Sequence, residues 1–149
     1  MSREDDKALV RRTIEEAWTK GNLDQLDEIV DVSHVDHGRH PEEVGGPAGR
    51  RQQIAMYRTA FPDFQATVEE QIAEGDKVVT RWTFRGTHLG ALQHPRLGTI
   101  PPTHKAVEFS GLTISHIVAG KIVDSWTIWD RLGLLQQLGV IPPPDSPQA

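Results

Sequence analysis

The chain has 149 residues, of which 37% are hydrophobic and 25% charged, and this balance favours one globular domain over a disordered chain. Its formal charge is -5 with both signs interspersed, so neither a basic nucleic-acid-binding face nor a polybasic membrane patch is expected. The chain contains no cysteine, which excludes disulfides, thiolate chemistry and cysteine metal sites.

The first part of the chain is predicted to be helical. Apolar residues recur at helical spacing from Leu9 to Trp18, and Gly21 is a natural stop. The stretch NLDQLDEIV predicts a second helix, with Asn22 as its cap. A loop rich in His, Gly and Pro follows, and a third helix is expected over residues 48–60, ended by Pro62.

The rest of the chain is predicted to form an antiparallel sheet. Strands are expected over residues 64–73 and 77–85, joined by the turn EGD, and over residues 106–118 and 121–129, joined by AGK. A long Gly- and Pro-rich connection separates these two hairpins, and a short helix closes the chain. Helices first and strands second indicate an α+β domain, with helices packed on one face of a curved sheet.

The two ends of the chain bear on its location and domain limits. The opening MSREDDKALVRR is too polar for a secretory signal, and no apolar run approaches the roughly 20 residues of a membrane span, so a cytoplasmic protein is expected. The closing IPPPDSPQA is too rich in proline for a core. A single domain is therefore expected over residues 1–141, with a flexible tail over residues 142–149.

Four stretches carry a resemblance to a known family: FPDF after the third helix, EGDKVVTRWTFRGTHLG, AGKIVDSW and WDRLGLLQQLG. In this order they resemble the SnoaL-like polyketide cyclase family, within the nuclear transport factor 2-like superfamily. The resemblance implies a cone-shaped α+β barrel, in which a strongly curved, mostly antiparallel sheet wraps around a pocket with N-terminal helices and a short C-terminal helix. It also implies cofactor-free closure of an aromatic polyketide, although hydroxylases, isomerases, epoxide hydrolases and binding proteins share the superfamily.

The chain departs from this family at the acid/base carboxylate of the aromatic polyketide cyclases, three residues before the aspartate that opens the last helix. Here that position is Thr127, and the position of an assisting histidine on the preceding strand corresponds to Thr113. An unassisted hydroxyl group is a poor base near neutral pH. A pocket with both threonines is therefore expected to hold the two reacting ends of a substrate together, which lowers a barrier without proton transfer.

Asp130 stands between the last strand and a short leucine-rich helix, where it could cap or catalyse. Aspartate is a favoured cap, so capping is the preferred interpretation and catalysis stays open. Alternation along the strand puts Thr127 and Trp129 on one face and Trp126 and Ile128 on the other. By the resemblance, the Thr127 face is the pocket, and the opposite face is expected to pack on a second subunit. Apart from Asp130, no mid-strand carboxylate is predicted on the pocket face.

Seven histidines invite a metal site, but the sequence predicts none. His34, His37 and His40 lie three residues apart in SHVDHGRH, yet this stretch is too rich in Gly and Pro for a helix and no HExxH pattern occurs. The resemblance places His37 at the pocket rim, where a neutral imidazole could polarise a carbonyl or relay a proton; a plain loop histidine is the alternative. His88, in GTHLG, could contact the substrate or tie the long loop to the sheet.

Two further polar side chains are candidates for the pocket. Arg81, in the middle of a strand, could bind a carboxylate or an enolate oxygen, or could be a rim or interface residue. Tyr57, the only tyrosine, lies on the third helix, where its hydroxyl could point into the pocket or its ring could belong to the core.

These residues predict a cofactor-independent cyclase or isomerase that acts on a largely apolar polyketide or related secondary-metabolite intermediate, mainly by confining it. The predicted catalytic residues are His37, Tyr57, Arg81, Thr127 and Asp130. The predicted substrate-binding residues are Met56, Phe61, Trp82, His88, Thr113 and Trp129. A homodimer is expected, with no metal, cofactor, nucleic acid or membrane partner. A hydroxylase or epoxide hydrolase of the same fold and a non-catalytic small-molecule-binding protein remain alternatives.

Overall fold

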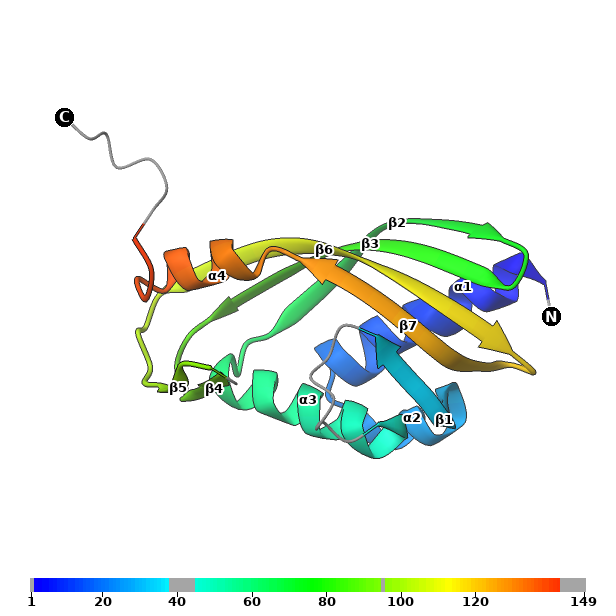
Figure 1. Ribbon diagram of the computed structural model, residues 1–149, viewed down its shortest axis with the longest axis horizontal. Helices are drawn as coiled ribbons and strands as arrows, with labels where there is room; N and C mark the ends of the chain where they lie inside the picture. Colours follow the sequence, from blue (N-terminus) through cyan, green and yellow to red (C-terminus); the bar gives the residue numbers. More distant parts are fainter. Residues whose placement is uncertain (1, 38–44, 95, 143–149) are drawn as a thin grey trace.

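The computed structural model describes residues 2–37, 45–94 and 96–142 (Figure 1). The elements in chain order are α1 (Arg3–Arg12), the π-helical turn η1 (Thr13–Thr19), the 3-10 turn η2 (Leu23–Gln25), α2 (Leu26–Ile29), β1 (Val30–His37), α3 (Gly46–Ala60), β2 (Gln65–Glu74), β3 (Lys77–Thr87), β4 (Leu92–His94), β5 (Gly98–Ile100), β6 (Ala106–Val118), β7 (Lys121–Trp129) and α4 (Arg131–Gln137). The predicted tail, apart from Pro142, lies outside the described residues. In the described part of the chain, no helix is long and apolar enough to cross a membrane.

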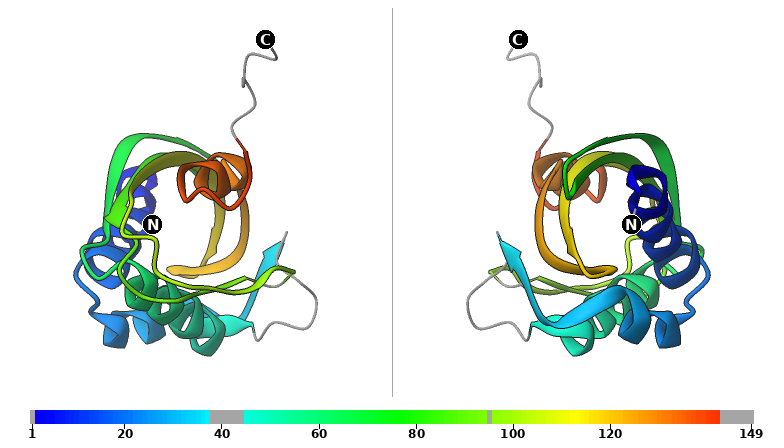
Figure 2. Two further views of the ribbon diagram at one scale, coloured as in Figure 1. Left: turned by 90° about the vertical axis from the view of Figure 1, so that its left-hand side faces the viewer. Right: turned by 90° about the vertical axis from the view of Figure 1, so that its right-hand side faces the viewer.

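The main sheet has five strands in the order β1-β7-β6-β3-β2, and β4 and β5 form a separate pair. It is strongly curved, and α1, η1 and α3 lie across its concave side (Figure 2). Among the described residues β1 and β2 are the edges, so the sheet stays open and does not close into a barrel. Three of its strand pairs are antiparallel and β1 with β7 is parallel. The predicted α+β class with a curved, mostly antiparallel sheet is confirmed.

Strand β1 differs from the sequence prediction, which has a loop in this segment. The predicted second helix is only the short turns η2 and α2, which end at Ile29. Asn22 does not cap it, because its side chain donates to Glu16 Oε2 at 3.0 Å. The inward positions of β1 include His34 and Asp36, so the strand lacks the apolar alternation that identifies a half-buried strand. Because its inner face is polar, this strand, which supplies part of the site, could not be recognised from the sequence.

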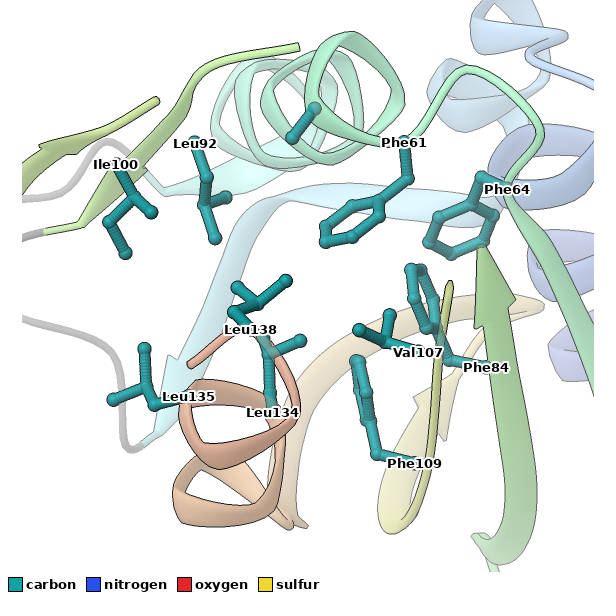
Figure 3. Packing of buried hydrophobic residues seen from close by; sticks show 11 residues of the cluster. Phe61, Phe64, Phe84, Leu92, Ile100, Val107, Phe109, Leu134, Leu135 and Leu138 are labelled. Atoms are coloured by element: carbon teal, nitrogen blue, oxygen red, sulfur yellow. The ribbon is translucent and has the colours of Figure 1, made fainter. Parts of the chain in front are cut away.

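Two clusters of buried apolar side chains hold the sheet and helices together. Figure 3 shows the first, where Phe61 and Phe64 meet Phe84 and Phe109 of the sheet and the leucines of α4. The rings of Phe64 and Phe84 lie 4.3 Å apart between centroids, and those of Phe84 and Phe109 4.4 Å apart. The second cluster joins α1, η1, α2 and α3 to the other end of the sheet; its buried members are Val10, Ala17, Leu26, Ile29, Val30, Ile54, Val78, Ile117 and Ile122.

Candidate active site

The concave face of the sheet carries its side chains in successive rows, because the strands pair in register. The rows are Asp36–Ser125–Ser115, Thr127–Thr113–Thr80, Trp129–Gly111–Trp82 and Phe109–Phe84. Members of one row come from neighbouring strands, which lie about 4.8 Å apart. The inner face is therefore graded, from charged and hydroxyl-bearing side chains at one end to aromatic rings at the other.

A cavity of about 140 Å³ lies over these rows, between the sheet and the helices. One water molecule needs only about 10–15 Å³ by the same measure, so this cavity has room for a small organic molecule. Its wall takes residues from both apolar clusters, which places it between them. Most of its surface is apolar, with the aromatic side chains of Trp18, Tyr57, Phe64, Trp82, Phe84, Phe109 and Trp129.

A largely buried ion pair lies at the polar end of the cavity. Arg50 of α3 and Asp36 of β1 approach to 3.5 Å between Nη2 and Oδ2, and their side chains are only 13% and 9% exposed. Arg50 also donates from Nη1 to Gln53 Oε1 at 2.9 Å, and all three residues line the cavity. This pair was not predicted from the sequence. The available signal was the alternation in VDVSHVDH, residues 30–37, which would put the polar residues His34 and Asp36 on one face of a strand.

The same end of the cavity is lined by hydroxyl groups. Ser125 of β7 and Ser115 of β6 are paired neighbours on adjacent strands, and each is 2% exposed. The Ser125 hydroxyl lies 3.0 Å from Nε2 of His34, which is also buried. Because Ser125 pairs with Asp36 in the parallel ladder, this hydroxyl lies next to the ion pair.

A chain of hydrogen bonds joins the middle rows. The Trp82 indole donates from Nε1 to Thr113 Oγ1 at 3.0 Å, and Thr113 Oγ1 lies 3.0 Å from Thr127 Oγ1. An indole nitrogen can only donate, so Thr113 Oγ1 accepts from Trp82 and its hydroxyl hydrogen is available to donate to Thr127 Oγ1. In that arrangement the Thr127 hydroxyl can donate to a carbonyl oxygen in the cavity, which both threonines line.

Six of the predicted site residues line the cavity: His37, Tyr57, Trp82, Thr113, Thr127 and Trp129. Five do not: Met56, Phe61, Arg81, His88 and Asp130. The alternation of β7 accounts for the first group, since Thr127 and Trp129 point inward as predicted. What each of the six does in a reaction remains a prediction.

His37 borders the cavity, but its imidazole is engaged on the outer face of the sheet. Its Nε2 lies 2.9 Å from Asp124 Oδ1, and its ring stacks on Trp126 at 4.6 Å between centroids. Asp124 also binds His116, which in turn binds Asp76. Hydrogen bonds from His37 and then His116 hold the pKa of the Asp124 carboxyl below its usual value. The geometry therefore favours a structural part for His37 over the predicted proton relay.

Arg81 points away from the cavity, because its neighbours Thr80 and Trp82 point inward along β3. Its Nε donates to Glu70 Oε1 at 3.0 Å, and its side chain is 47% exposed. This geometry favours the alternative of a rim or interface residue over a contact with an enolate or carboxylate inside the pocket. Two other arginines line the cavity, Arg50 of α3 and Arg131 of α4, and both lie on helices.

Asp130 is the cap of α4, as the preferred interpretation has it. Its Oδ1 accepts from the Gly133 backbone nitrogen at 2.8 Å. A Cβ at Gly133 would lie 2.1 Å from Asp130 Oδ2, so glycine makes room for the capping carboxylate. Asp130 is absent from the cavity wall, and the open alternative of a catalytic carboxylate has no geometric support.

His88, Phe61 and Met56 are displaced from the cavity for separate reasons. Phe61 and His88 are fully buried and pack on each other, with ring centroids 5.4 Å apart. His88 Nδ1 accepts from the Thr103 backbone nitrogen at 3.1 Å, and desolvation lowers the pKa of His88, so it ties the long loop to the core. Met56 lies on the flank of α3, because Arg50, Gln53 and Tyr57 occupy the face toward the cavity.

Within residues 2–37, 45–94 and 96–142, no group of three or more His, Asp or Glu side chains is placed to hold a metal ion. Two histidines of the SHVDHGRH stretch are accounted for: His34 contacts Ser125 and His37 contacts Asp124. The third, His40, lies outside the described residues.

Comparison with known proteins supports one family. TsrD from Streptomyces laurentii is 28% identical with a TM-score of 0.83, over 95% of this chain and 99% of that chain. IdmH from Streptomyces antibioticus, a proposed polyketide cyclase, is 30% identical with a TM-score of 0.74, over 90% and 98%. AclR from Streptomyces galilaeus, a proposed hydroxylase, is 27% identical with a TM-score of 0.72, over 95% and 85%.

No curated protein sequence matches the chain significantly. A family model described as SnoaL-like polyketide cyclase, in contrast, matches residues 8–138. That match runs from within α1 to the end of α4 and includes every strand that lines the cavity. The chain belongs to the SnoaL-like polyketide cyclase family.

Proposed function

We propose that this protein is a cofactor-independent cyclase or isomerase, and that its substrate is a largely apolar polyketide or related secondary-metabolite intermediate. The observation that carries this proposal is the graded cavity, with a mostly apolar surface that includes several aromatic rings, and with hydroxyl groups and one ion pair at its other end. Family membership and the likeness to cyclases support the reaction class.

Confinement is the main source of acceleration in this proposal. A flexible polyketide chain pressed between Trp82, Trp129 and Phe109 is held folded, so that its two reacting ends stay close. Holding reactants in a productive geometry can contribute about 7–11 kcal/mol toward a barrier. The Thr127 hydroxyl, at the end of the chain from Trp82, stabilises the oxygen on which negative charge develops. Thr127 thus takes the place, but not the basicity, of the family's carboxylate.

Tryptophan fluorescence offers a direct test of binding. Trp18, Trp82 and Trp129 line the cavity, whereas Trp126 lies on the outer face of β7. Titration with an anthraquinone should therefore quench most of the emission, and the Trp126→Phe variant should retain that quenching while Trp82→Phe and Trp129→Phe weaken it. Quenching that depends on Trp126 alone would refute binding in the cavity, and binding without turnover of any polyketone would favour a carrier protein.

A hydroxylase is the second candidate, and one observation favours it. Asp36 places a carboxylate in the cavity, where it could activate an oxygen nucleophile, and AclR is a proposed hydroxylase. Mass spectrometry of the product separates the two reactions, because hydroxylation adds one oxygen atom whereas cyclisation conserves the substrate mass or loses water.

We further propose a homodimer formed across the outer face of the sheet. Four apolar side chains lie together on the outer sides of β6 and β7: Leu112, Ile114, Trp126 and Ile128. Ile128 is 80% exposed, which is unfavourable for an isolated chain in water. Lys77, beside Trp126, and the carboxylates of Asp76 and Asp124 offer opposite charges on the same face, which a second copy can pair around a two-fold axis. Sedimentation of the parent and of Ile128→Lys tests this: a monomeric parent would refute it.

A further inference from the structure

The Asp36–Arg50 pair is unexpected in a cavity whose surface is mostly apolar. Removing two charges from water costs free energy that their attraction only partly repays, and well-packed apolar residues are often at least as stable at such places. The pair nevertheless lies at the cavity wall, with side chains 9% and 13% exposed. Its position there, in contact with the space a ligand would fill, points to a part in chemistry.

We propose that Asp36 accepts a proton from the substrate and that Arg50 stabilises the enolate that results. This inference rests on the proposed function and narrows its substrate class to an intermediate with an enolisable carbonyl end and an apolar, unsaturated body. The carbonyl end lies at Asp36 and Arg50, and the body lies along the tryptophans and phenylalanines. The cavity therefore contains a carboxylate base on β1, whereas the sequence analysis expected none apart from Asp130.

The choice of Asp36 follows from the side chains around the cavity. Among the described residues that line it, Asp36 is the single carboxylate, and the Thr113 and Thr127 hydroxyls are poor bases. Its position is defined by the parallel pairing of Asp36 with Ser125, whose hydroxyl is held by His34. These contacts fix the strand that carries the base, which general-base catalysis requires.

The distance within the pair also suits this chemistry. Arg50 Nη2 lies 3.5 Å from Asp36 Oδ2, longer than the 2.7–2.9 Å typical of a tight charge-assisted hydrogen bond. The guanidinium is oriented by Gln53 on the next turn of α3, so its position does not depend on Asp36 alone. Arg50 can therefore attract a substrate oxygen on which charge develops while Asp36 is taking up a proton.

The proposed cycle is balanced and regenerates the protein. An Asp36 carboxylate oxygen takes the proton from a carbon next to a carbonyl, and the C–H electron pair becomes the C=C bond of an enolate. The enolate carbon attacks a second carbonyl carbon of the same molecule and forms the C–C bond. The alkoxide oxygen formed there takes the proton back from Asp36, which returns to its carboxylate form.

Hydrogen–deuterium exchange into naphthylacetone isolates the first step, because it needs no knowledge of the natural substrate. The probe has an aromatic body and an enolisable methylene group, and exchange in D₂O is followed by NMR. We expect the parent to accelerate exchange, and Asp36→Asn to bind the probe within about threefold of the parent while losing at least a hundredfold in exchange rate. The matched control is Asp31→Asn, an aspartate of the same strand that does not line the cavity, with parental exchange.

Two outcomes separate failure of this inference from failure of the proposed function. If naphthylacetone neither binds to the parent nor quenches its tryptophan emission, the proposed function and this inference are both refuted. If the parent binds and exchanges, and Asp36→Asn exchanges at the parental rate, Asp36 is not the base although the cavity function stands.

Loss of folding in Asp36→Asn is a foreseeable complication, because it leaves Arg50 with a weakened partner. Asp36→Ala supplies the second measurement: it leaves space beside Arg50 for formate, a small carboxylate. Exchange by Asp36→Ala should rise with formate concentration, and exchange by the parent and by Asp31→Asn should not. A folded Asp36→Ala that formate does not rescue, in a protein whose parent exchanges, would overturn the assignment.

Discussion

Replacing Gly111 with alanine should narrow the cavity and destabilise the fold. Gly111 lies between Trp82 and Trp129 in the aromatic row, and an added Cβ would lie 2.5 Å from Trp82 Cζ2 and 2.7 Å from Trp129 Cβ. The Trp129 Cβ is fixed by its backbone and cannot yield, so the Trp82 ring must move. That ring packs on Phe109, with centroids 6.1 Å apart, and its Nε1 holds Thr113.

The expected loss combines three contributions. Overpacking costs about 1–3 kcal/mol. Breaking the Trp82–Thr113 hydrogen bond costs about 1 kcal/mol more. Alanine restricts the unfolded chain and returns about 0.4–1 kcal/mol. The backbone φ of Gly111 is not positive, so backbone strain adds nothing. The sum is a loss of about 1–3.6 kcal/mol from the free energy of unfolding.

Urea unfolding measures this loss, and quenching by an anthraquinone measures the cavity. Gly111→Ala should unfold at lower urea and bind the anthraquinone more weakly. The matched control is Gly75→Ala, where a Cβ meets nothing within 4 Å but the φ of +61° costs about 1–2 kcal/mol. That control should lose stability and keep binding. A Gly111→Ala variant as stable as the parent, with unchanged binding, would refute the packing argument.

Three further predictions concern single side chains. Asp130→Ala should lower the free energy of unfolding by about 0.5–2 kcal/mol through loss of the α4 cap, and a lower thermal unfolding temperature together with an unchanged rate of naphthylacetone exchange would separate capping from catalysis. Thr127→Asp should accelerate proton abstraction from an enolisable polyketide mimic, and no gain over the parent would count against a Thr127 side chain that reaches the substrate. Hydrogen bonds that His116 donates to Asp124 and to Asp76 raise the pKa of His116, so its stabilising contribution is complete below about pH 6.5 and is lost as pH rises through the raised value. His116→Gln should therefore flatten the decline in urea stability between about pH 6 and pH 8, and a decline as steep as the parent's would assign it to other groups.

The elements with strong local signals were predictable from the sequence. The hairpins turn at EGD and AGK, and alternation along β7 correctly puts Thr127 and Trp129 on the cavity face. Helix α3 was predicted with its end at Ala60, although it starts two residues earlier than expected. These features depend on nearby residues, which is why a single sequence suffices for them.

The polar end of the cavity was not predictable by the same means. Strand β1 has polar residues on its inner side, so it lacks an apolar stripe, and its partner is the last strand of the sheet. Arg50 lies on the polar face of α3, where an exposed arginine is the ordinary expectation. Only the tertiary arrangement brings Arg50 and Asp36 together, whereas Arg81 was a candidate because an arginine in the middle of a strand needs a partner or a ligand.

Parallel pairing of β1 with β7 has a consequence for how the protein matures. Asp36 meets Ser125 only after nearly the whole chain is available, so this end of the site has the highest contact order of the sheet. On a ribosome, the hairpin of β2 and β3 can form while β7 is still unsynthesised, and the nascent chain then contains Asp36 but not the strand that positions it. Ligand-binding competence should accordingly be the last property that a newly made molecule acquires.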